Sequence, residues 1–160
     1  MKILVISDTH GHMDRAARVL KKESPVDAVI HCGDIEGQEH ALEKMAACPC
    51  YMVTGNNDWA SFLKREITTS FDGVRVFITH GHRYGVTLGN ERIREEADSR
   101  DVDLCLFGHT HRPVIETIGK LTLMNPGSLS YPRQAGRKPT YGIIETGGEQ
   151  RLRCSIRQLD

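Results

Sequence analysis

Five short apolar runs of this chain are followed by Asp, Asn or His, the residue types that commonly ligate metal ions. This repeated pattern constrains the fold more than any other feature of the sequence. The runs cover residues 3–7, 29–33, 51–55, 74–79 and 104–108. The polar side chains that follow them are Asp8, His10, Asp34, Asn56, His80, His109 and His111. Short apolar runs bounded by turn residues predict buried strands. The pattern therefore predicts a sheet with polar side chains gathered at one edge.

The rest of the chain alternates strand and helix patterns, which is typical of an α/β protein. We expect helices at residues 14–23, 36–47 and 91–99, and a short helix at 59–64. Strands are expected at residues 3–7, 26–32, 51–54, 66–71, 74–79, 104–107, 114–118, 121–125, 140–145 and 151–157. Asp72-Gly73 predicts a hairpin turn. Parallel and antiparallel portions together predict two packed sheets with helices outside.

Size and charge narrow the class of protein. A chain of 160 residues predicts a single domain spanning residues 1–160. Its 21 basic and 21 acidic side chains balance, which argues against binding nucleic acid or membrane through bulk charge, but allows a small phosphoester substrate. No apolar run approaches the roughly 20 residues that span a bilayer, and no signal peptide is evident. We expect a cytoplasmic protein, with homo-oligomerisation left open.

The seven polar side chains predict a metal centre with oxygen and nitrogen ligands. In open α/β sheets, ligands bind beyond the carboxyl ends of the strands. Seven ligands without a thiolate exceed one tetrahedral zinc site and fit two divalent cations sharing one carboxylate. Asp34, on a middle strand, is the expected bridge. Each residue alone is equally consistent with a helix cap or a buried polar group. The coincidence of five strand ends favours the metal centre.

The spacing of these motifs resembles that of a known family. The motifs are Asp8-x-His10, Gly33-Asp34, Gly55-Asn56-x-Asp58, His80-Gly81-His82 and Gly108-His109-Thr110-His111. In order and spacing they resemble the calcineurin-like metallophosphoesterases, over most of the chain to about Arg133. The short length and the run from Asn125 to Ser128 resemble the small bacterial and archaeal phosphodiesterases of the YfcE/MJ0936 type.

The resemblance implies a four-layer α-β-β-α sandwich of two mixed sheets and a phosphodiesterase reaction. It implies one ion held by Asp8, His10, Asp34 and His111, and a second held by Asp34, Asn56, His80 and His109. Manganese is the first expectation, with Ni, Zn, Fe, Co and Mg as alternatives. A hydroxide bridging the two ions would attack phosphorus. The alternative is a non-catalytic protein-interaction scaffold on the same fold, like the retromer subunit.

One position departs from the family pattern. Asn57 stands where histidine is common, and an amide donates hydrogen bonds but cannot act as a general acid. We therefore expect aryl esters to react faster than alkyl esters. Asn57, Asp58 and His82 are the candidate catalytic residues beyond the ligands, with a structural role as the alternative for Asp58. Arg112 and Arg133 are candidate phosphate contacts, or ordinary solvated arginines.

Overall fold

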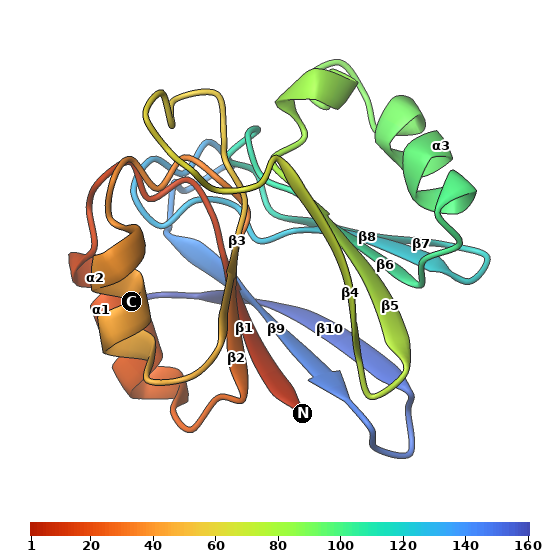
Figure 1. The fold of residues 1–160 in the computed structure, drawn as a ribbon, viewed down its shortest axis with the longest axis horizontal. Helices are drawn as coiled ribbons and strands as arrows, with labels where there is room; N and C mark the ends of the chain where they lie inside the picture. Colours follow the sequence, from red (N-terminus) through yellow and green to blue (C-terminus); the bar gives the residue numbers. More distant parts are fainter.

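Ten strands form two mixed five-stranded sheets in the computed structural model, which describes residues 1–160 (Figure 1). The first sheet has the order β10-β9-β1-β2-β3, and the second has the order β4-β5-β6-β8-β7. The first comprises β1 (Lys2–Ile6), β2 (Ala28–His31), β3 (Cys50–Met52), β9 (Thr140–Thr146) and β10 (Leu152–Gln158). The second comprises β4 (Glu66–Phe71), β5 (Val74–Thr79), β6 (Leu104–Leu106), β7 (Val114–Ile118) and β8 (Leu121–Asn125).

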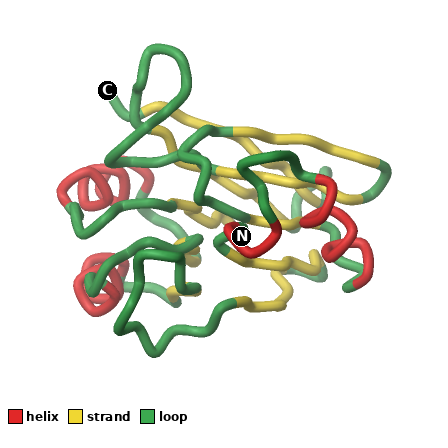
Figure 2. The backbone as a smooth tube through the Cα atoms, turned by 90° about the horizontal axis from the view of Figure 1, so that it is seen from above, coloured by secondary structure: helices red, strands yellow, loops and turns green.

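Helices cover the outer faces of both sheets, on opposite sides of the molecule (Figure 2). The first sheet packs against α1 (Asp14–Glu23) and α2 (Glu39–Ala46), and the second against α3 (Glu91–Ser99). Successive side chains of β1 alternate between two cores, because strand side chains point to opposite faces. Ile3 and Val5 lie between the sheets, whereas Leu4 and Ile6 pack on the helix side. The four-layer α-β-β-α sandwich is confirmed.

Most expected elements are present, and two differences have physical causes. Helix α2 begins at Glu39 rather than residue 36. Glu36 and Gly37 have φ values of 53° and 79°, which a right-handed helix excludes. The expected helix at 59–64 was wrong. Trp59 and Phe62 are exposed by 91% and 105%, so a helix there would have no core to bury them against.

The carboxyl ends of the central strands meet at one end of the sandwich. In the first sheet β1, β2 and β3 run parallel, and in the second β5, β6 and β8 do. Backbone hydrogen bonds join the loops that follow: the amides of Asp8, His10 and Gly108 donate to the carbonyls of Gly33, Asp34 and His80. No helix of the structure is long and apolar enough to span a membrane.

Candidate metal centre

Five of the seven expected ligands have left-handed backbone conformations. The φ values are 54° at Asp8, 47° at His10, 58° at Asp34, 66° at His109 and 58° at His111. Such φ values are uncommon outside glycine, and strained residues persist only where the surrounding structure holds them. Their concentration at the ends of three strands, β1, β2 and β6, indicates that the loops are shaped to aim these side chains at one place.

Two glycines in the loops that carry candidate ligands make room for the carboxylates. A Cβ on Gly108 would lie 2.6 Å from Asp8 Oδ2 and collide with the Ser7 hydroxyl. A Cβ on Gly55 would collide with the Asp34 carboxylate. These glycines are therefore required by close approach, as expected where a backbone passes a binding site.

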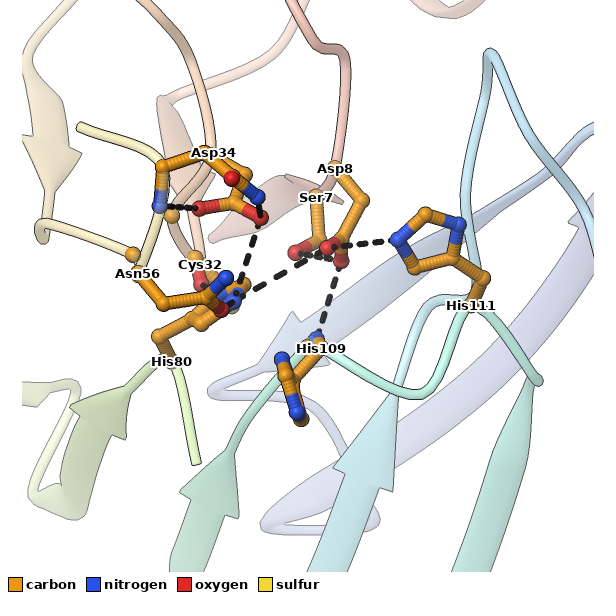
Figure 3. A network of polar contacts seen from close by, with 12 residues as sticks. Ser7, Asp8, Cys32, Asp34, Asn56, His80, His109 and His111 are labelled. Atoms are coloured by element: carbon orange, nitrogen blue, oxygen red, sulfur yellow. Dashed lines mark hydrogen bonds and ion pairs between the residues drawn. The ribbon is translucent and has the colours of Figure 1, made fainter. Parts of the chain in front are cut away.

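The side chains from both sheets converge on two buried carboxylates (Figure 3). Asp34 Oδ2 lies 3.8 Å from His10 Nε2 and 3.5 Å from His80 Nε2, one histidine from each expected ion. Asp8 Oδ1 lies 3.2 Å from His111 Nε2 and 3.9 Å from His80 Nε2. Two compact groups with ligand atoms within 4.8 Å of one another result, Asp8–His10–His111 and Asp8–Asp34–His80.

Backbone carbonyls fix the orientation of two of the imidazoles. His80 Nδ1 lies 2.7 Å from the Cys32 carbonyl oxygen, and His111 Nδ1 lies 2.7 Å from that of Tyr131. Because a carbonyl only accepts, Nδ1 carries the proton in both rings. Each Nε2 lone pair then faces the carboxylates. This arrangement is typical of histidines that ligate metals.

Acceptor atoms therefore face one another across the centre. Asp8 Oδ1 is buried and receives no hydrogen bond. His10 Nε2 and His111 Nε2 are 3.2 Å apart, and His80 Nε2 is 3.1 Å from Asn56 Oδ1. Buried polar atoms are normally paired, and an unpaired one requires an explanation. Only a cation between these atoms, either a proton or a metal ion, makes the arrangement favourable, so the residues fit divalent cations.

The charges of the cluster shift its protonation equilibria. Burial raises the pKa of Asp8, but His111 and His80 lower it by more, so it lies below its ordinary value. Burial likewise raises the pKa of Asp34, but His80 and the hydrogen bonds from Asn57 lower it by more and hold it well below its usual range. Burial lowers the pKa of His80, and the two carboxylates raise it above its ordinary value. Both carboxylates are therefore ionised, as metal ligands must be.

Sequence reasoning missed several residues that hold the ligands. Glu36 Oε1 lies 2.7 Å from His10 Nδ1, which leaves His10 Nε2 facing the centre. The Ser128 hydroxyl donates to the Asp8 carbonyl at 2.8 Å, and the Asn125 amide donates to the Gly108 carbonyl at 2.7 Å. Glu36 follows Asp34 by two residues, and that proximity was the available signal.

The three other candidate residues lie at the centre but differ in what they contact. The Asn57 amide Nδ2 donates to Asp34 Oδ2 at 2.7 Å, and its backbone N–H donates to Oδ1 at 2.8 Å. Asp58 accepts the backbone N–H groups of Asp34, Gly55 and Glu36. His82 begins a 3₁₀ turn at His82–Tyr84, and its buried Nδ1 has no hydrogen-bond partner.

His109 lies outside both compact groups. Its backbone N–H donates to Asp8 Oδ2 at 3.1 Å. Its ring centroid lies 5.2 Å from that of His80 and 6.1 Å from that of His82. The structure thus joins six of the seven expected ligands in one connected set of contacts, and the His109 ring lies beside them, near His80.

Comparison with known proteins agrees with this geometry. The calcineurin-like phosphoesterase superfamily domain matches residues 1–149. The phosphodiesterase YfcE of Escherichia coli is 31% identical, and the match covers 91% of this chain and 88% of YfcE. A predicted phosphoesterase from Streptococcus pneumoniae has a solved structure with a TM-score of 0.85 and 28% identity, over 98% of this chain and 88% of that one.

Vps29 shares the fold at lower sequence identity. Vps29 from Entamoeba histolytica superposes with a TM-score of 0.80 and 20% identity, and the match covers 100% of both chains. That likeness concerns the fold alone. The family match over most of the chain and the similarity to YfcE concern the sequence as well. This chain belongs to the calcineurin-like phosphoesterase superfamily.

Proposed function

We propose that the protein is a phosphodiesterase that uses two divalent metal ions. The observation that carries the proposal is the set of inward-facing acceptors, above all the buried Asp8 Oδ1 that receives no hydrogen bond. Asp8, His10, Asp34 and His111 would hold one ion, and Asp34, Asn56, His80 and His109 the other. Similarity to YfcE supports the choice of a diester substrate.

Each group of the chain has a separate task in this reaction. When bound, the ions would supply hydroxide at neutral pH and would offset negative charge on the phosphoryl oxygens. Asp34 Oδ2 lies 3.8 Å from His10 Nε2 and 3.5 Å from His80 Nε2, one histidine of each set, which supports Asp34 as a shared ligand. Glu36 orients His10, and the Cys32 and Tyr131 carbonyls orient His80 and His111.

The test is hydrolysis of 4-nitrophenyl diesters and monoesters by metal-stripped protein reloaded with Mn, Ni, Zn or Mg. We expect turnover of the diester with at least one metal. Metal at about 100 times its Kd would add about 3 kcal/mol to the free energy of unfolding. The absence of both turnover and thermal stabilisation with all four metals would contradict the proposal.

Asn57 bears on which esters react. It replaces a residue able to protonate a leaving group, and its amide holds Asp34 instead. We expect the rate to depend steeply on leaving-group pKa across a series of substituted phenyl esters. The variant Asn57→His should flatten that dependence, since general acid catalysis is typically worth ~10²–10⁴-fold. An unchanged slope would remove this role from position 57.

A protein-binding scaffold is the second candidate. The exposed side chains of Trp59 and Phe62, beside the centre, are the observation that favours it. A scaffold of this kind would show no turnover with any metal, and would lose partner binding in the variant Trp59→Ala. The paired metal titration and ester assay distinguish the two candidates.

A further inference from the structure

Two hollows of opposite character border the candidate centre. One, of about 760 Å³, is lined by His10 and His111 together with Arg15, Arg112, Arg133 and Arg137, and no carboxylate lines it. The other, of about 650 Å³, is lined by Glu36, Glu39, Asp58 and the aromatic rings of Trp59 and Phe62. A chain with a net charge of zero thus places four positive charges on one side of its centre.

Three of the four arginines of the first hollow, which we call the arginine hollow, are free to bind an anion. Arg112, Arg133 and Arg137 are exposed and form no ion pair. By contrast, Arg100 pairs with Glu66 at 2.6 Å, and Arg151 pairs with Asp103 at 2.9 Å. Clustered cations without counter-ions repel one another, and a bound anion would offset that repulsion.

The wall that carries these arginines is anchored to the candidate ligands. The Arg133 backbone N–H donates to the His111 carbonyl at 3.0 Å. Arg15 donates to the Leu129 carbonyl at 2.7 Å and so fastens the preceding turn. The Tyr131 ring, at the edge of the hollow, lies 5.3 Å from the His10 ring. The hollow is therefore positioned relative to the centre before any substrate arrives.

We propose that the physiological substrate is a phosphodiester with a second phosphate group, and that Arg112, Arg133 and Arg137 bind this second phosphate. The inference rests on the proposed function and adds the substrate class. The scissile phosphate lies at the centre, and the second phosphate occupies the arginine hollow beside His10 and His111. Guanidinium groups suit this task because they form paired, charge-assisted hydrogen bonds to phosphate oxygens.

Two aryl diesters that differ by one phosphate test the inference. Thymidine 5′-(4-nitrophenyl phosphate) lacks a second phosphate, and its 3′-phosphorylated counterpart carries one. We expect kcat/KM to be about tenfold higher or more for the phosphorylated ester, given the strength of hydrogen bonds to charged groups. In the triple variant Arg112→Ala/Arg133→Ala/Arg137→Ala the preference should vanish, so that the ratio of the two kcat/KM values falls to about one.

The matched control removes three positive charges elsewhere. The triple variant Arg65→Ala/Arg92→Ala/Arg153→Ala alters exposed arginines outside the hollow and should keep the preference. Equal kcat/KM for the two esters in the wild type, or a preference that survives in the hollow variant, would overturn the inference.

Calorimetric titration of the metal-free protein with inorganic pyrophosphate gives a readout independent of turnover. We expect binding to the wild type and the control, weakened about tenfold in the hollow variant. If neither ester is hydrolysed but this difference appears, the proposed function fails and the anion site stands. No binding, or equal binding to all three proteins, would remove the anion site.

Discussion

Two buried carboxylates of this protein, Glu23 and Asp8, have opposite surroundings. Glu23 is 3% exposed, and donors surround it: Tyr141 and Arg157 each at 2.7 Å, and Lys2 at 3.0 Å. Asp8 is fully buried, and its Oδ1 faces imidazole nitrogens and receives no hydrogen bond. The protein surrounds Glu23 with its own cations, whereas the Asp8 carboxylate faces the imidazole nitrogens of candidate metal ligands.

This difference in hydrogen-bond partners indicates that Glu23 serves stability and Asp8 serves function. A buried charge with all its partners holds the fold together, and losing one partner is costly. An unsatisfied buried charge departs from the rule that buried polar groups are paired, and such departures are expected at functional sites. Substitutions at the two carboxylates should therefore have opposite consequences.

The largest expected effect is on activity, in the variant Asp8→Asn. Removing one carboxylate ligand should lower kcat/KM by about 10³-fold, because charge stabilisation of several kcal/mol is lost. The metal-free protein should change in unfolding free energy by less than about 1 kcal/mol, since an amide can donate to His111 Nε2. Activity assays and urea unfolding measure the two quantities. A variant that unfolds more easily but keeps its activity would reverse the assignment.

The variant Glu23→Gln should have the opposite effect to Asp8→Asn. Its activity should be unchanged, and its free energy of unfolding should be lower. The hydrogen bonds at Glu23 outweigh the opposing effect of burial and lower its pKa from 4.5 to about 2. A depressed carboxylate pKa contributes stability above pH 4.5 that is lost as pH falls to about 2, here about 3 kcal/mol. Urea unfolding at pH 7 should show that deficit in the variant, and the gap should close toward pH 2. A gap independent of pH would contradict this explanation.

The smallest effect is expected at Glu36, which lies between the two extremes. It contacts a candidate ligand, His10 Nδ1, at 2.7 Å, while remaining at the surface. Substituting a residue that orients a metal ligand typically lowers metal affinity or activity by about 10–100-fold. We expect Glu36→Gln to weaken metal binding by about tenfold with little loss of stability, measured by metal titration. The neighbour Glu39→Gln is the control, because the Glu39 carboxylate accepts from the Ser61 hydroxyl at 3.0 Å and contacts no candidate ligand. Equal losses in both variants would exclude orientation of His10.

The sequence predicted the strands and the convergence of ligands because both depend on local pattern. Val74–Thr79 and Leu121–Asn125 appear in the structure with the expected bounds, since apolar runs bounded by turns need little tertiary information. The gathering of Asp8, Asp34 and His80 followed from the rule that parallel strands end at one edge.

Tertiary contacts could not be predicted in the same way. The hydrogen bond from the Ser128 hydroxyl to the Asp8 carbonyl joins residues 120 positions apart, so no local sequence pattern predicts it. The hydrogen bond from Asn57 to Asp34 likewise depends on how two loops pack. The helix expected at 59–64 failed because an apolar residue such as Trp59 indicates burial only where a partner surface exists.

The division of candidate ligands between the two sheets has a mechanical consequence. Asp8 and Asp34 follow strands of the first sheet, whereas His80 and His111 follow strands of the second. Ions held by all four would cross-link the two layers at one end of the interface between them. By thermodynamic linkage, any strain that separates the layers lowers metal affinity, and metal binding resists that separation. Cohesion between the halves of the sandwich and occupancy of its centre would then vary together.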